Sequence, residues 1–203
     1  MFPKNSPEYE LLTTLDTPQK VQTFLDALPF NHEQGGETCM SPLRVLRERK
    51  AHCIEGALLA SVCFMRMGRK PLIANLKVME SDYDHIVAIF TENGYYGAVS
   101  KTNHPVLLYR DPIYRSVREL MMTYYHELFL YTTGEKTLLG YTKPINTRRF
   151  GSKWITAEED LWDIAEIMYD APILPMVPEK NRRFIRDAQD FERRALDVEQ
   201  WER

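Results

Sequence analysis

One segment of this chain constrains its fold more than any other feature. From Cys53 to Met67 the sequence reads CIEGALLASVCFMRM, with Gly68 directly after it. A helix that is apolar on nearly every side belongs in the middle of a core, and glycine is common just past a helix end. The segment therefore predicts a buried central helix that other layers of the structure must cover.

Strand signals follow this helix directly. The strand candidates are Pro71–Met79, Asp84–Phe90 and Tyr95–Lys101. The last two are joined across Asn93 and Gly94, a dipeptide that is a strong signal for a tight β-hairpin turn. We therefore expect antiparallel strands beside the buried helix.

Helix-start signals lie on both sides of this core. A threonine or serine followed by proline suits the N-cap and the first helical position, and this pair occurs at residues 17–18 and 41–42. Further helices are predicted from about Ser116 to Leu128 and from Thr156, which has three acidic residues in the expected first turn. Because helices and strands are segregated rather than alternating, the predicted fold class is α+β.

The C-terminal residues 181–203 predict a charged helix with a heptad stripe. Apolar residues recur there at alternating spacings of four and three, at Phe184, Ala188, Phe191, Ala195 and Val198. We expect this helix to dock on the chain's own core, with a homodimer through the same helix as the alternative.

The length of 203 residues suits a single domain. Within it we expect an N-terminal helix and loop over residues 1–40, a core over residues 41–112, and a helical extension over residues 113–203 that packs on the core.

Composition argues against several partners and compartments. The net charge of −3 leaves no basic excess for nucleic acid or an anionic membrane. The N-terminus lacks the basic and apolar run of a secretory signal, and no apolar stretch is long enough to cross a bilayer. The 3 cysteines are an odd number and too few for a disulfide scaffold, so we expect a reducing compartment, the cytoplasm.

Two residues at the ends of predicted elements suggest thiol chemistry. A cysteine becomes a good nucleophile as thiolate, which a helix N-terminus and a neighbouring imidazolium both favour. Cys53 begins the buried helix, and His85 opens the strand before the hairpin. We therefore expect Cys53 as nucleophile and His85 as its base, although a lone buried cysteine is more often a small apolar core residue, as we expect for Cys63.

The order of these features resembles a known family. The run Leu46–Cys53 leads into the buried helix, Asp84 and His85 open a strand, and Tyr96–Ser100 forms the strand after the turn. Over roughly residues 41–112 this arrangement is similar to the transglutaminase-like superfamily of papain-type fold. The resemblance implies a central helix packed on an antiparallel sheet, with C-terminal helices added.

The resemblance also implies a third member of the site, and here the chain departs from the family. Ser100 stands where the family has an acidic residue, and Ala51 stands where it often has glycine. A two-residue turn pairs Val87 with Ser100, which puts Ser100 diagonal to His85 on the same face. Ser100 is therefore the expected orienter of the His85 ring. Asn103 is the alternative, although strict alternation turns it to the opposite face.

The resemblance implies a cysteine amidohydrolase or acyl transferase that works through a thioester. Its substrate would be a peptide, a protein or a small amide, and no cofactor is expected. A zinc site built from Cys39, His52, Cys53 and His85 is disfavoured because no Cys-x-x-Cys or His-x-x-x-His pair is present. His52 is expected to cap the helix or line a groove. The alternative function is a binding or scaffold protein that has lost efficient turnover, which the serine at position 100 favours.

Overall fold

The computed structural model describes residues 4–201 and contains one antiparallel sheet as its middle layer. The strands of its main path lie in the order β4-β3-β2-β1-β5-β7, and β6 also pairs with β1. The strands are β1 (Leu72–Val78), β2 (His85–Glu92), β3 (Tyr95–Val99), β4 (Arg110–Tyr114), β5 (Leu138–Thr142), β6 (Ile145–Asn146) and β7 (Ile173–Pro175). The predicted α+β class with an antiparallel sheet is confirmed.

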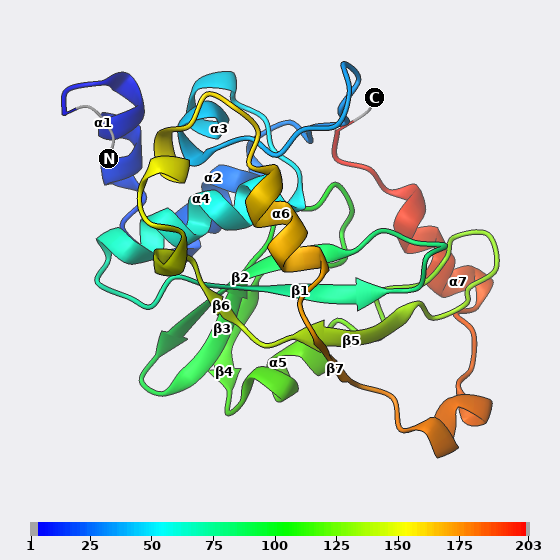
Figure 1. Ribbon diagram of the computed structural model, residues 1–203. Helices are drawn as coiled ribbons and strands as arrows, with labels where there is room; N and C mark the ends of the chain where they lie inside the picture. The colour runs from blue at the N-terminus through cyan, green and yellow to red at the C-terminus, as the bar shows by residue number, and fades with distance from the viewer. Residues whose placement is uncertain (1–3, 202–203) are drawn as a thin grey trace.

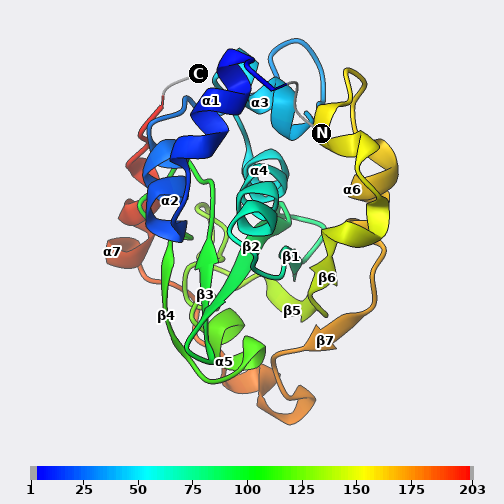
Figure 2. The same ribbon diagram turned by 90° about the vertical axis from the view of Figure 1, so that its left-hand side faces the viewer.

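The predicted buried helix is α4 (Cys53–Arg66), and it covers one face of the sheet. All of its residues from Ile54 to Phe64 are buried, and Gly68 follows with a left-handed φ of 73°. Figure 2 shows α4 end-on between α2 (Pro18–Asp26) and α6 (Trp162–Tyr169). The other face of the sheet is covered by α5 (Val117–Met122), which lies below the strands in Figure 1.

The serine or threonine before proline works as a helix start three times. Ser6, Thr17 and Ser41 cap α1 (Pro7–Thr14), α2 and α3 (Pro42–Glu48), and each side-chain oxygen accepts a hydrogen bond from a backbone N–H in the first turn. The predicted starts of α2 and α3 are confirmed. Short 3₁₀ turns complete the chain at Thr147–Phe150, Lys153–Thr156, Glu179–Phe184 and Arg194–Asp197.

The extension over residues 113–203, which was expected to be helical, also contains strands. This part of the chain supplies β5, β6 and β7, and β5 pairs with β1 in the middle of the sheet. Four of the five residues of β5 are buried, so its sequence lacks the polar and apolar alternation of a half-exposed strand. Periodicity therefore could not reveal it.

Two predicted helices have different bounds in the structure. The helix expected from Thr156 begins instead at Trp162, because the acidic residues before it bind α3: Glu158 pairs with Arg47, and Asp160 pairs with Arg44. The helix expected to reach Leu128 starts after the N-cap Ser116 as predicted but ends at Met122.

The predicted heptad helix over residues 181–203 is also wrong. The described part of this segment holds only α7 (Asp190–Arg193) and short 3₁₀ turns, and the side chains of Phe184 and Phe191 are exposed. Ala188 is buried and donates its N–H to the carbonyl of Gly134. That contact takes the backbone of Ala188 out of any helical ladder, and a highly charged helix without a packed apolar face has little else to stabilise it.

Within residues 4–201 no helix is long and apolar enough to span a membrane.

The packing of α4 depends on a glycine in its second turn. A Cβ placed on Gly56 would lie 2.6 Å from Cβ of Lys101, a contact that side chains do not tolerate. We expect Gly56→Ala to lower the free energy of unfolding by about 1–3 kcal/mol, as overpacking does in cores. Urea unfolding measures the change. Gly35→Ala is the control, since its Cβ would meet nothing within 4 Å; equal stability of both variants would contradict this account of α4.

Candidate active site around Cys53

The thiol of Cys53 lies at the start of α4, where the chain turns in from an extended segment. Cys53 is the first helical residue, and the N-cap His52 has extended backbone angles, φ −106° and ψ −170°. A bridge between Phe30 and Ala51 fixes the approach of the chain to this helix. The sulfur lies 3.9 Å from the carbonyl oxygen of Asp84, and the side chain is only partly buried. The thiol therefore faces the beginning of β2.

The imidazole of His85 lies at the start of β2, where a hydrogen bond with Ser100 holds the ring. The pairing of Ala88 with Val99 in the hairpin is the register that the predicted turn requires. Ser100 follows β3 directly, and its hydroxyl oxygen lies 2.7 Å from Nε2 of His85. Because Ser100 occupies Nε2, the other ring nitrogen, Nδ1, is left for Cys53.

Ser100 is itself fixed by a residue that sequence analysis missed. The side chain of Gln22 on α2 accepts a hydrogen bond from the Ser100 N–H at 2.9 Å and donates one to the Ser100 carbonyl at 2.8 Å. Both residues are buried. A single polar residue on an amphipathic helix carries no sequence signal for such a role.

Asn103, the alternative orienter, serves a different part of the structure. Its side-chain amide donates to the carbonyl of Trp201 at 2.9 Å, and its side-chain oxygen accepts the N–H of Trp201 at 2.9 Å. Asn103 thus anchors the end of the described chain. The nearest acid along the sequence, Asp84, is also committed elsewhere, because its carboxylate accepts hydrogen bonds from β1, including the N–H of Val78. A hydroxyl is therefore the group that holds the His85 ring.

A second imidazole lies beside the thiol. Nε2 of His52 is 3.0 Å from the carbonyl oxygen of Thr38, 3.4 Å from Oε1 of Glu33 and 3.5 Å from Oε1 of Glu55. The cap position expected for His52 is confirmed. Its contact with the site was not predicted. Adjacent residues inside a helix point in different directions, but the backbone of His52 is extended, and its side chain can therefore lie beside that of Cys53.

The buried carboxylate of Glu55 organises the loop around this imidazole. Glu55 is 0% exposed and accepts hydrogen bonds from the N–H of His52, the N–H of Met40, the hydroxyl of Thr38 and the side-chain amide of Asn31. A charged residue within an otherwise apolar helix was a visible signal. Its partners could not be read from the sequence, because they lie in the loop over residues 31–40.

The two imidazoles set the charge state of Cys53. Burial by itself favours the neutral thiol, but hydrogen bonds from His52 and His85 and the positive charges of both rings lower the pKa of Cys53 to about 5. Burial likewise opposes a charge on His52, but its hydrogen bond to Cys53 and the charge of Glu55 raise the pKa of His52 to about 9. The arrangement favours a thiolate paired with imidazolium at neutral pH.

The other two cysteines have the opposite character. Cys39 and Cys63 are fully buried, and burial raises the pKa of each to about 12. In Cys63 this matches the apolar role expected from the sequence. Their thiols stay protonated and shielded, so Cys53 is the cysteine whose surroundings favour the thiolate.

No group of three or more metal-binding side chains is assembled within residues 4–201.

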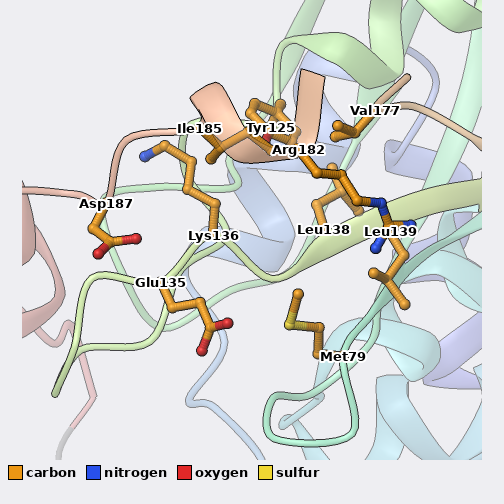
Figure 3. Close-up of a pocket in the computed structure, with 10 residues that line it drawn as sticks. All are labelled: Met79, Tyr125, Glu135, Lys136, Leu138, Leu139, Val177, Arg182, Ile185 and Asp187. Atoms are coloured by element: carbon orange, nitrogen blue, oxygen red, sulfur yellow. The ribbon is translucent and has the colours of Figure 1, made fainter. Parts of the chain in front are cut away.

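A cavity of about 190 Å³ lies elsewhere, and none of the residues around Cys53 lines it. Figure 3 shows the basic Lys136 and Arg182 and the acidic Glu135 and Asp187 around this cavity, among apolar side chains from β5 and the C-terminal segment.

The sequence was also compared with known proteins. A scan against models of protein families gave no match, and a search among curated proteins gave none either.

Proposed function

We propose that this protein is a cysteine amidohydrolase or acyl transferase that forms a thioester on Cys53. The observation that carries the proposal is a half-buried cysteine at the start of a buried helix, with two imidazoles that lower the pKa of its thiol. Thiolate, a base within hydrogen-bonding reach and free N–H groups of a first helical turn are the parts that acyl transfer to sulfur requires.

The first half of the reaction forms the thioester. The Cys53 thiolate attacks the substrate carbonyl carbon, an S–C bond forms, and the carbonyl electron pair moves to oxygen. N–H groups at the start of α4 stabilise this oxyanion. The C–N bond then breaks as protonated His85 gives its proton to the leaving amine.

The second half releases the acyl group. Neutral His85 takes a proton from water or an acceptor amine, whose oxygen or nitrogen attacks the thioester carbonyl. The S–C bond breaks, the thiolate of Cys53 returns and protonated His85 is restored. Water as acceptor makes the protein a hydrolase, whereas an amine makes it a transferase.

The proposed relatives are the transglutaminase-like proteins of papain-type fold. This assignment is supported by a cysteine at the start of the helix that crosses the sheet, a histidine at the start of a neighbouring strand, and a third residue across the hairpin. The proposed substrates are peptides, proteins or small amides. The hydroxyl of Ser100 in place of an acid favours a second candidate, a binding protein of the same fold with little turnover, because a hydroxyl adds no charge to stabilise an imidazolium.

An acyl-enzyme experiment separates these candidates. With p-nitrophenyl acetate at pH 7, we expect one acetyl group on Cys53, detected by intact-protein and peptide mass spectrometry and removed by hydroxylamine. Cys53→Ala should lose the adduct, and Cys63→Ala, the control at a buried thiol, should keep it. Release of the acetyl group to water or to an added amine then distinguishes hydrolase from transferase. An adduct that forms without turnover would favour the binding protein, and no adduct on Cys53 would overturn the thioester proposal.

A further inference from the structure

The carboxylates of this site lie beside His52 and not beside His85. The ring of His85 contacts the neutral hydroxyl of Ser100, and within residues 4–201 no carboxylate pairs with this ring. The carboxylates of Glu33 and Glu55 instead lie 3.4 Å and 3.5 Å from Nε2 of His52. The group best placed to carry a lasting positive charge is therefore His52.

We propose that the two imidazoles divide the work of a catalytic histidine: His52, backed by Glu55 and Glu33, is the standing imidazolium that pairs with the Cys53 thiolate, and His85 moves the proton. The inference rests on the proposed thioester chemistry and extends it. His52 contacts the reacting sulfur and takes over the electrostatic role of the absent acid, without passing a proton to the substrate.

The hydrogen-bond partners of the two rings differ in a way that supports this division. The Thr38 carbonyl can only accept, so Nε2 of His52 must carry a proton, and a second ring proton donated to Cys53 makes the ring an imidazolium. The Ser100 hydroxyl can accept or donate, so Nε2 of His85 is satisfied with or without its proton. His85 can therefore change its protonation state without losing its partner.

Glu55 gives an independent reason for a charge on His52. It is fully buried, and each of its partners donates a hydrogen bond to it, an arrangement that suits a carboxylate. A buried carboxylate is costly unless a cation pairs with it. Within the described residues, the only cationic side chain within 4.0 Å of Glu55 is the ring of His52.

The other titratable groups around the sulfur do not supply this positive charge. Besides burial, the charge of Cys53 helps to raise the pKa of the Cys39 thiol and of the Tyr169 phenol on α6. The carbonyl oxygen of Asp84 lies 3.9 Å from the sulfur. Each of these groups is neutral or negative. The positive charge at Cys53 therefore comes from the two imidazoles.

Absorbance at 240 nm against pH measures the thiolate directly and tests the division. Wild type should show a thiolate step near pH 5 that His52→Gln raises by at least one pH unit, which is about a tenfold loss of thiolate at low pH. His85→Ala should keep most of the low-pH thiolate and lose acyl turnover. Glu33→Gln should shift the step slightly in the same direction as His52→Gln. His126→Gln is the matched control at a distant histidine and should leave the profile unchanged.

A reciprocal measurement guards against misfolding of the variants. In wild type, the ring signals of His52 in NMR should titrate near pH 9, and Cys53→Ala should lower that midpoint because the anion is gone. If His52→Gln leaves the thiolate step in place, or if Cys53→Ala leaves the His52 titration in place, the division of work is wrong while the thioester function stands. If wild type has an ordinary thiol near pH 8.5, both the thioester proposal and the division are wrong.

Discussion

At pH 6, iodoacetamide should alkylate Cys53 about tenfold faster than it alkylates a small free thiol. The two rates should become equal at about pH 7, and above that pH the free thiol should react faster. Two effects oppose each other. With a pKa of about 5, Cys53 is mostly thiolate at pH 6, whereas a thiol of pKa about 8.5 is roughly 0.3% thiolate there. The lower basicity of Cys53 removes part of that advantage, because nucleophilicity falls with pKa by a Brønsted slope of about 0.4–0.5.

The shape of the pH profile is the sharper test. The rate for Cys53 should rise as pH increases through about 5 and then stay level, because the folded thiol is already ionised. Cys39 and Cys63 should not react in the folded protein, since both are fully buried with raised pKa values. Peptide-resolved mass spectrometry after timed alkylation follows all three cysteines at once. A Cys53 profile that rises only near pH 8.5 would remove the basis of the proposed chemistry.

The second large effect is expected at the proton carrier. His85→Ala should lower acyl turnover by about 10²–10⁴-fold, the usual contribution of a positioned acid–base group. Ser100→Ala should cause a smaller loss, of about tenfold, because the imidazole stays but loses its 2.7 Å partner. The measurement is steady-state release of p-nitrophenol at pH 7, with each variant checked by circular dichroism.

Two controls make this result specific to the imidazole. Added free imidazole should restore part of the turnover of His85→Ala and none of that of Cys53→Ala. His104→Ala changes another histidine on the chain segment that follows β3, and it should retain turnover close to wild type. Turnover of His85→Ala within threefold of wild type would exclude His85 as the proton carrier.

Much of the fold near the site could be predicted because its signals are local. The all-round apolar character of α4, the cap residues before prolines and the Asn93-Gly94 turn each act within a few residues. The turn also determines the hairpin register, which is why the sequence alone placed Ser100 diagonal to His85. The strands β5 to β7 were missed because buried or very short strands lack alternation.

The charge arrangement around the thiol was decided only in three dimensions. The sequence alone determined that a cysteine begins a buried helix and that a histidine opens a strand of the following hairpin. It did not determine that His52 faces the same sulfur or that Glu33 and Glu55 lie within 3.5 Å of that ring. Nor did it determine that Gln22 forms a hydrogen bond with Ser100. These contacts join separate segments of the chain, and packing rather than local propensity brings such segments together. Hydrogen bonds between distant side chains follow from that packing, so they appear only with the folded structure.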